Sequence, residues 1–190
     1  MRKLIASNLI SIDGYFEGVN RDLSGFKFDT GIYGSMVTLF DRSDTILIGK
    51  TTYEFFVAYW PGKSKSDDPA ADFMNQYDKL VFSSSLTEAP WGKWKPATII
   101  NKNIEGEVKK LKEQRGKDMI IFGSGDMVSA LSKADLIDEY RFIVNPVILG
   151  AGKQQFYHDN KLPLKLKAAT VLPSGLVVLD YERDRNSSAG

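Results

Sequence analysis

The chain lacks cysteine and has a single histidine, His158, among its 190 residues. The absence of cysteine excludes disulfides and thiolate metal sites, and a zinc site would need to be built almost wholly from carboxylates, which zinc seldom accepts. We therefore expect no metal ion and no metal catalysis. We expect His158, which lies in the sequence FYHDN between two candidate strands, to be a surface residue and not a catalyst.

An excess of charge of one sign is also lacking. The sequence has 25 Lys and Arg residues against 24 Asp and Glu residues, for a net charge of +1. Such a chain offers no broad positive field to attract a phosphate backbone. We expect no nucleic-acid partner.

Long apolar runs are missing as well. No stretch approaches 18 consecutive apolar residues, and Ser7, Asn8 and Ser11 interrupt the first apolar stretch too early for a signal peptide. We expect no membrane span and a cytoplasmic location. With 43% hydrophobic and 26% charged residues, the composition is that of a globular protein. We predict one domain over residues 1–190, with a frayed tail at 185–190.

The hydrophobic pattern predicts strands and helices in alternation. Apolar runs predict strands at 2–10, 45–49, 79–84, 97–100 and 119–122. Helical spacing predicts helices at 36–40, 51–60, 104–111 and after Gly125. The stretch from Gly14 to Gly34 is predicted as a long functional loop, and 62–72 as a polar surface excursion. Alternation around Pro173-Ser174-Gly175 predicts a C-terminal hairpin. The fold class is therefore α/β: an open, mostly parallel sheet flanked by helices, with an antiparallel C-terminal hairpin.

Two glycine turns each join a predicted buried strand to a predicted helix. One is Gly-Ser-Gly at 123–125, and the other is Gly49 followed by Lys50 and two threonines. Such a corner offers free backbone N–H groups and the positive end of a helix dipole to an anion, and glycine lets a phosphate approach the main chain. One helix terminus contributes only about 0.3 to 1 kcal/mol, or about 2 when partly buried. We predict that both corners together hold one extended ligand with more than one phosphate, such as a dinucleotide.

Each corner also has a plainer interpretation. Gly-Ser-Gly alone can be a tight turn, and it lacks the third glycine of a Rossmann fingerprint. Gly49 does not belong to a Walker loop, because Asp44 stands where the first glycine of that loop is required. Lys50 alone can be a solvated side chain.

Several segments occur in an order that resembles the dihydrofolate-reductase-like family. They are SIDGY at 11–15, ILIGKTTYE at 46–54, LVFSSS at 80–85, IIFGSGDM at 120–127 and LIDEYRFIVNPVILGAGKQQF at 136–156. The resemblance covers residues 2 to 183 and is closest to the reductase domain at the C-terminus of the bacterial riboflavin-biosynthesis deaminase-reductase and to its stand-alone relatives. It implies a dihydrofolate-reductase-like fold, an NADPH-dependent oxidoreductase and a homodimer. The zinc deaminase of the bifunctional enzyme is absent, because its zinc site requires cysteines.

The resemblance also implies cofactor-binding residues. The matching positions are Gly49, Lys50, Thr51 and Thr52 on the adenosine side, Ser83 and Ser84 beside the 2′-phosphate, and Gly123, Ser124, Gly125, Asp126 and Met127 at the pyrophosphate. Lys50 and Ser84 stand where relatives often have Arg, so the planar fork of Arg is lost at both positions. NADPH is the expected cofactor, and NADH is the alternative.

The substrate is expected beside the nicotinamide, near the first strand and the long loop. The candidate substrate-binding residues are Asn8, Tyr15, Tyr53 and Trp60, and the candidate catalytic residues are Asp13, Asp29 and Tyr33. Hydride transfer to a C=N or C=O bond requires a proton donor or a donor-rich pocket. Asp13 can instead belong to a simple Asp-Gly turn, and Asp29 can be a loop carboxylate or a helix cap.

The resulting hypothesis is an NADPH-dependent reductase of a small heterocycle or imine. A riboflavin-pathway substrate, of the 5-amino-6-(5-phosphoribosylamino)uracil type, and a pterin-like substrate are both open. Gly123 stands where riboflavin-pathway reductases have a substrate-binding Glu. This difference weakens the case for a riboflavin-pathway substrate. One alternative is a nucleotide-binding or small-molecule-binding module without turnover. Another is a structural dimer with empty turns.

Overall fold

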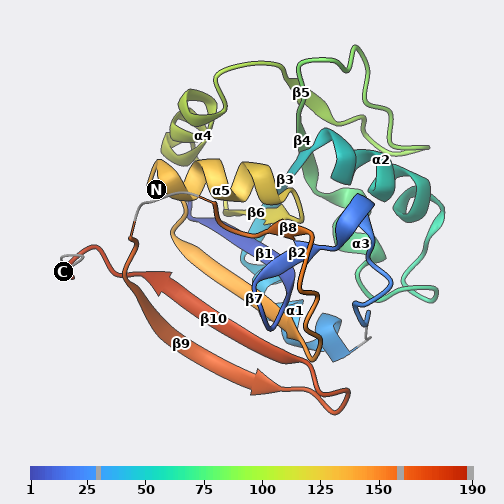
Figure 1. The fold of residues 1–190 in the computed structure, drawn as a ribbon. Helices are drawn as coiled ribbons and strands as arrows, with labels where there is room; N and C mark the ends of the chain where they lie inside the picture. Colours follow the sequence, from blue (N-terminus) through green and yellow to red (C-terminus); the bar gives the residue numbers. More distant parts are fainter. Residues whose placement is uncertain (29–30, 158–160, 188–190) are drawn as a thin grey trace.

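An eight-stranded sheet forms the centre of the computed structural model, which describes residues 1–28, 31–157 and 161–187 (Figure 1). The strand order is β5-β4-β3-β6-β1-β7-β10-β9. The strands are β1 (Leu4–Ser11), β3 (Ser43–Gly49), β4 (Asp78–Phe82), β5 (Thr98–Ile100), β6 (Asp118–Phe122), β7 (Glu139–Asn145), β9 (Leu164–Val171) and β10 (Val177–Arg183). The six strands from β5 to β7 run parallel, whereas β10 is antiparallel to both β7 and β9. The predicted fold class is confirmed.

Helices cover both faces of the sheet (Figure 1). They are α1 (Gly31–Asp41), α2 (Lys50–Tyr59), α3 (Ala71–Gln76), α4 (Ile104–Glu113) and α5 (Gly125–Lys133). Alternate residues of β6 point to opposite faces: Ile120 packs in the core under α1, α2 and α3, and Ile121 packs in the core under α4 and α5. Because both faces are covered, the middle of β3 (Ile46, Leu47, Ile48) and most of β6 (Met119 to Phe122) are continuous apolar runs rather than alternating ones.

The C-terminal hairpin has the predicted turn. Leu172 donates its N–H to the carbonyl of Leu176 at 2.9 Å, and Gly175 at the turn has a φ of +87°, which glycine adopts without strain. The strand β9 lies at the edge of the sheet, and nearly all of its side chains are exposed.

Two predicted loops contain regular structure. The polar excursion at 62–72 ends in the short helix α3, and the stretch 14–34 contains β2 (Tyr15–Glu17), the 3-10 helix η1 (Val19–Arg21) and the start of α1. The strand β2 pairs with β8 (Lys153–Gln154) in a separate two-stranded sheet. Elements of two or three residues are too short to show periodicity, so the sequence pattern does not reveal them.

Some predictions fall on residues outside the described ranges. These residues include Asp29, His158 and positions 188–190 of the predicted tail. Within the described ranges, no helix combines the length and the apolar character that a membrane crossing requires.

The order of the strands brings the two predicted corners together. The strands β3 and β6 are parallel neighbours, with Leu47 opposite Ile121. Their C-terminal ends therefore meet at one edge of the sheet, where α2 and α5 begin. On the other side of β6 lies β1, with Ser7 opposite Phe122. Three adjacent strands, β3, β6 and β1, thus lie side by side at the edge of the sheet where the two corners are found.

Candidate functional site

The two glycine corners are joined by hydrogen bonds. The N–H of Gly49 donates to Ser124 Oγ at 2.8 Å. Thr52 Oγ1 accepts from the backbone N–H of Ser124 at 3.1 Å and from its hydroxyl at 2.9 Å. Gly123 and Ser124 both have left-handed backbone conformations, with φ of +56° and +52°. Ser124 and Thr52 therefore tie the start of α2 to the start of α5.

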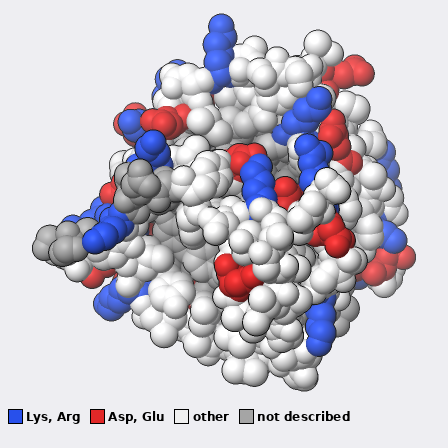
Figure 2. All heavy atoms as spheres, in the orientation of Figure 1, with Lys and Arg blue, Asp and Glu red and all other residues white. Residues whose placement is uncertain are grey.

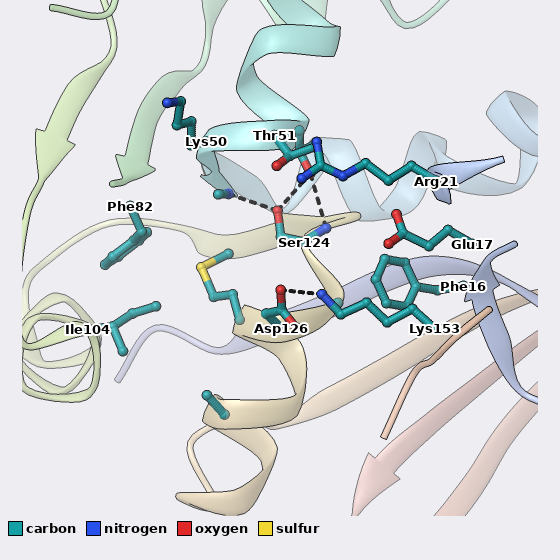
Figure 3. A pocket seen from close by; sticks show the side chains of 15 residues that line it. Phe16, Glu17, Arg21, Lys50, Thr51, Phe82, Ile104, Ser124, Asp126 and Lys153 are labelled. Carbon is teal, nitrogen blue, oxygen red and sulfur yellow. Dashed lines mark hydrogen bonds and ion pairs between the residues drawn. The ribbon is translucent and has the colours of Figure 1, made fainter. Parts of the chain in front are cut away.

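Both corners open on one cleft of about 400 Å³, which we call the corner cleft (Figure 3). It is lined by Phe16, Glu17, Arg21, Gly49, Lys50, Thr51, Thr52, Phe82, Ile104, Ser124, Gly125, Asp126, Met127, Ala130 and Lys153. The first N–H groups of a helix have no partner within that helix. Because α2 and α5 both begin at the cleft, two sets of such donors and two positive helix ends lie around it.

Phe16 requires a glycine at position 125. A Cβ built on Gly125 would lie 2.3 Å from Cε1 of the Phe16 ring, which is closer than any real carbon contact. The ring comes from β2 and forms a wall of the corner cleft (Figure 3). The absence of a side chain at Gly125 therefore lets this aromatic wall and the backbone of α5 share the same cleft.

Charges of both signs surround the hollow on this face (Figure 2). Asp126 accepts hydrogen bonds from Lys153 Nζ and from the Tyr157 hydroxyl, the latter at 2.9 Å. Burial alone would raise the pKa of Asp126, but these two hydrogen bonds outweigh it and hold the pKa below its ordinary value. Lys50 lies at the outer end of the cleft, where Nζ donates to Ser85 Oγ at 3.1 Å.

Sequence reasoning missed Arg21, Lys153 and Phe16. Arg21 reaches into the cleft toward Thr51 and Ser124 (Figure 3). Lys153 belongs to GAGKQQF, a segment that carried the family resemblance, so a signal for it was present. For Arg21 we find no signal, because η1 is a single turn with left-handed conformations at Asn20 and Arg21.

The corner cleft continues into two further pockets, and we call all three together the groove. The middle pocket, of about 480 Å³, shares Phe16, Glu17, Arg21, Thr51, Thr52 and Ser124 with the corner cleft. The aromatic pocket, of about 310 Å³, shares Ser7, Leu9, Phe28, Phe55, Phe56 and Phe122 with the middle pocket. The groove therefore runs from backbone donors and charges at one end to aromatic walls at the other.

Of the two catalytic candidates in the described part of the chain, Tyr33 lines the groove and Asp13 does not. Asp13 lines none of the three pockets, and its carboxylate accepts from the N–H groups of Leu149 at 3.1 Å and Gly150 at 2.7 Å. Its hydrogen bond with Ser11 and these backbone bonds lower its pKa to about 2. Tyr33 does line the aromatic pocket. Burial and the neighbouring Asp68, to which its hydroxyl donates at 3.0 Å, raise the pKa of Tyr33 above its ordinary value.

The substrate candidates divide into two groups. Asn8 lines the middle pocket, with Nδ2 donating to Gln155 Oε1 at 2.6 Å, and Trp60 lines the aromatic pocket. Tyr53 and Tyr15 line none of the three pockets. The Tyr53 hydroxyl donates to the carbonyl of Pro90 at 2.8 Å, and Tyr15 lies in β2, opposite Gln154.

Ser83 and Ser84 follow β4 at the edge of the groove and line none of its three pockets. Ser83 Oγ accepts from the N–H groups of Ser85 at 3.2 Å and Leu86 at 3.1 Å, so it closes the turn after the strand. Ser84 is exposed. Of the predicted cofactor-binding residues, Gly123 lines the middle pocket, and the other corner residues line the corner cleft.

The family model of the RibD C-terminal domain matches residues 2–178. The chain belongs to this family. Among curated proteins, it is similar to the uncharacterized protein YyaP of Bacillus subtilis (strain 168), with 29% identity over 186 residues that cover 95% of this chain and 94% of YyaP. The resemblance stated from the sequence is confirmed, and the chain is a member of a reductase family.

Solved structures confirm the fold of this RibD C-terminal domain family member. A putative riboflavin biosynthesis protein from Shewanella sp. PV-4 has a TM-score of 0.75 at 22% identity, covering 96% of this chain and 99% of that one. Dihydrofolate reductase from Enterococcus faecalis, complexed with NADP(H), has a TM-score of 0.61 at 11% identity, covering 96% of both chains. The fold is dihydrofolate-reductase-like.

Proposed function

We propose that the chain is an NADPH-dependent reductase that adds hydride to a C=N or C=O bond of a small heterocyclic or imine substrate. The proposal rests on the two glycine corners at Gly49 and Ser124, which are joined by a hydrogen bond. Both open on a groove that ends in aromatic walls. Membership in the RibD C-terminal domain family supports a reductase. The NADP(H) of the similar dihydrofolate reductase supports the choice of cofactor.

The groove fits NADPH in size and chemistry. The N–H groups at the starts of α2 and α5 suit the phosphates, and Arg21, Lys50 and Lys153 add positive charge. Phe82 and Ile104 supply apolar walls for the adenine at the outer end of the corner cleft. The middle pocket then receives the nicotinamide, and the aromatic pocket receives the substrate. When bound, NADPH supplies the hydride.

The protein itself orients the reactants and surrounds them with aromatic side chains. Phe55, Phe56 and Phe122 line both inner pockets, so the reacting atoms would meet in apolar surroundings. We do not assign proton donation to Asp13, because it is an ionised carboxylate outside the groove. The Tyr33 hydroxyl donates its hydrogen bond to Asp68, so we assign Tyr33 to the wall of the pocket and not to proton donation. Water is the proposed source of the proton.

The main alternative is a binding module without turnover. An anaerobic mixing experiment distinguishes it from a reductase. Protein loaded with NADPH is mixed with pterins, aminouracil ribosides and neutral ring imines, and the reduced-nicotinamide absorbance is followed. The proposal expects oxidation of NADPH with at least one compound in the panel. Saturable NADPH binding without any oxidation across the panel would favour the binding module.

The family also suggests a cytoplasmic homodimer, which remains part of this proposal.

The Lys50→Glu variant is expected to bind NADPH about tenfold more weakly, because it replaces a positive charge at the outer end of the corner cleft with a negative one. Fluorescence titration of NADPH measures the change. Lys95→Glu is the matched control, since Lys95 is exposed and pairs with Asp78 at the opposite end of β4. Equal affinities of the two variants would remove Lys50 from the proposed phosphate site.

A further inference from the structure

The aromatic pocket has no cationic lining. Among the described residues that line it there is no Lys or Arg, and its walls include Phe55, Phe56, Tyr59, Trp60 and Phe122. The residues outside the described ranges, at 29–30, 158–160 and 188–190, contain neither Lys nor Arg. A phosphate or carboxylate buried here would find no Lys or Arg among the described lining to pair with, and burial of an unpaired charge is strongly unfavourable.

A buried carboxylate stands behind this pocket. Asp68 is only 5% exposed, and its Oδ2 accepts from the hydroxyls of Tyr33 at 3.0 Å and Tyr59 at 3.2 Å. Both tyrosines line the aromatic pocket. Their hydroxyl hydrogens point to Asp68, so they are not available to an anion in the pocket. The negative charge of Asp68 would also repel such an anion.

The charged side chains of the middle pocket lie where it joins the corner cleft. Glu17 and Arg21 are the charged residues among its described lining, and both also line the corner cleft. Under the proposed function, Arg21 faces the phosphates of the cofactor. It therefore offers no separate site for an anionic substrate.

One polar atom remains without a partner where the two inner pockets meet. Ser7 is 3% exposed and lines both pockets, and its Oγ has no hydrogen-bond partner among the described residues. A buried hydroxyl without a partner is unfavourable, so such groups are normally matched by a ligand or water. The Ser7 hydroxyl can donate one hydrogen bond and can also accept from a donor.

We propose that the substrate is an uncharged, flat, conjugated ring compound whose C=N bond is reduced and whose single polar edge group bonds to Ser7. A substrate that places a phosphate or carboxylate in the aromatic pocket is thereby excluded. The inference rests on the proposed function for the source of hydride and names the substrate class of the same site. In the net reaction, the C=N bond accepts one hydride from NADPH at carbon and one proton from water at nitrogen. The products are the C–H and N–H bonds of the amine, NADP⁺ and hydroxide.

The test compares a neutral ring compound with its own carboxylate and with a phosphorylated riboside. Titration calorimetry in the presence of NADP⁺ measures the affinities of quinoxaline, quinoxaline-2-carboxylate and 5-amino-6-(5-phosphoribosylamino)uracil. The neutral ring is expected to bind at least about tenfold more tightly than either anion. An anion that binds as tightly as quinoxaline, or more tightly, would overturn the substrate class.

Two variants test whether the preference for the neutral ring over the anions arises in the aromatic pocket. Phe55 lies on α2, is 61% exposed and lines both inner pockets, so Phe55→Lys adds a cation without disturbing the core. It should shift the ratio of the two quinoxaline affinities toward the carboxylate by about tenfold. Ser7→Ala should weaken quinoxaline binding several-fold without lowering the melting temperature, because the lost hydroxyl has no partner in the protein. An unchanged ratio in the first variant, or unchanged quinoxaline affinity in the second, would overturn the assignment of this pocket.

A parallel NADPH titration separates this inference from the proposed function. Saturable NADPH binding without preference for the neutral ring would overturn the substrate class and leave the reductase intact. Preference for the neutral ring without NADPH binding would overturn the reductase and support the ligand class of the pocket.

Discussion

The Gly125→Val variant is expected to bind NADPH about 100-fold more weakly than the native chain, a loss of about 2.8 kcal/mol. Any Cβ at position 125 meets the Phe16 ring, which must then move, and valine adds two methyl groups at the first residue of α5. Both changes obstruct the N–H groups that we assign to the cofactor phosphates. NADPH fluorescence titration measures the effect.

The matched control for this variant is Gly34→Ala in α1. A Cβ at Gly34 would meet nothing within 4 Å, and alanine in a helix stabilises by about 0.5 to 1 kcal/mol relative to glycine. NADPH affinity should therefore be unchanged in the control. A folded Gly125→Val protein with native NADPH affinity would show that the corner at α5 does not hold the cofactor.

The second large effect concerns stability in acid. Glu139, at the start of β7, accepts a hydrogen bond from Lys3 Nζ at 2.8 Å and pairs with Arg42 and, at 3.1 Å, with Lys167. Burial alone would raise the pKa of Glu139, but hydrogen bonds from Arg42, Lys3 and Lys167 and the charge of Arg42 outweigh it and lower the pKa from 4.5 to about 2. The folded state therefore favours the ionised carboxylate. Its contribution is fully present above about pH 4.5 and is lost as the pH falls toward 2.

We expect Glu139 to account for about 3 kcal/mol of unfolding free energy that the native chain loses between pH 5 and pH 2. In Glu139→Gln, the stability at pH 7 should be lower and the loss over this pH range smaller, because no carboxylate titrates there. Urea denaturation at several pH values measures both. Glu113→Gln, which changes an exposed residue at the end of α4, should retain the native pH dependence. An equal loss on acidification in Glu139→Gln and the native chain would contradict this role.

Both glycine corners could be predicted because each depends on local sequence. A buried strand, a glycine and an apolar helical pattern follow one another at Gly49 and again at Gly123 and Gly125. Their adjacency depends on β3 and β6 being neighbours in the sheet, although more than 60 residues separate them in sequence. The sequence placed both corners at strand ends of one open sheet but did not predict that β3 and β6 are neighbours. The hydrogen bonds that Ser124 makes with Gly49 and Thr52 could not be predicted, because side-chain contacts across strands leave no periodic signal.

The inner end of the groove was harder to predict because it is built from non-local contacts. Asp68 belongs to a stretch whose composition suggested only a surface excursion, yet it is buried against two tyrosines. Asp13 was a catalytic candidate, and it bonds instead to the N–H groups of Leu149 and Gly150. Tyr53 follows the second corner in sequence, but its hydroxyl donates to Pro90 outside the groove. Sequence position near a motif does not decide which way a side chain points.

The most direct test of the central claim is a calorimetric titration of the native chain with NADPH at low and at moderate salt. If the two corners hold one extended dinucleotide, the protein should saturate with one NADPH per chain at micromolar concentrations, and added salt should weaken binding because charged groups contribute. If binding does not saturate at millimolar NADPH, although circular dichroism shows that the protein is folded, the two corners do not hold the dinucleotide.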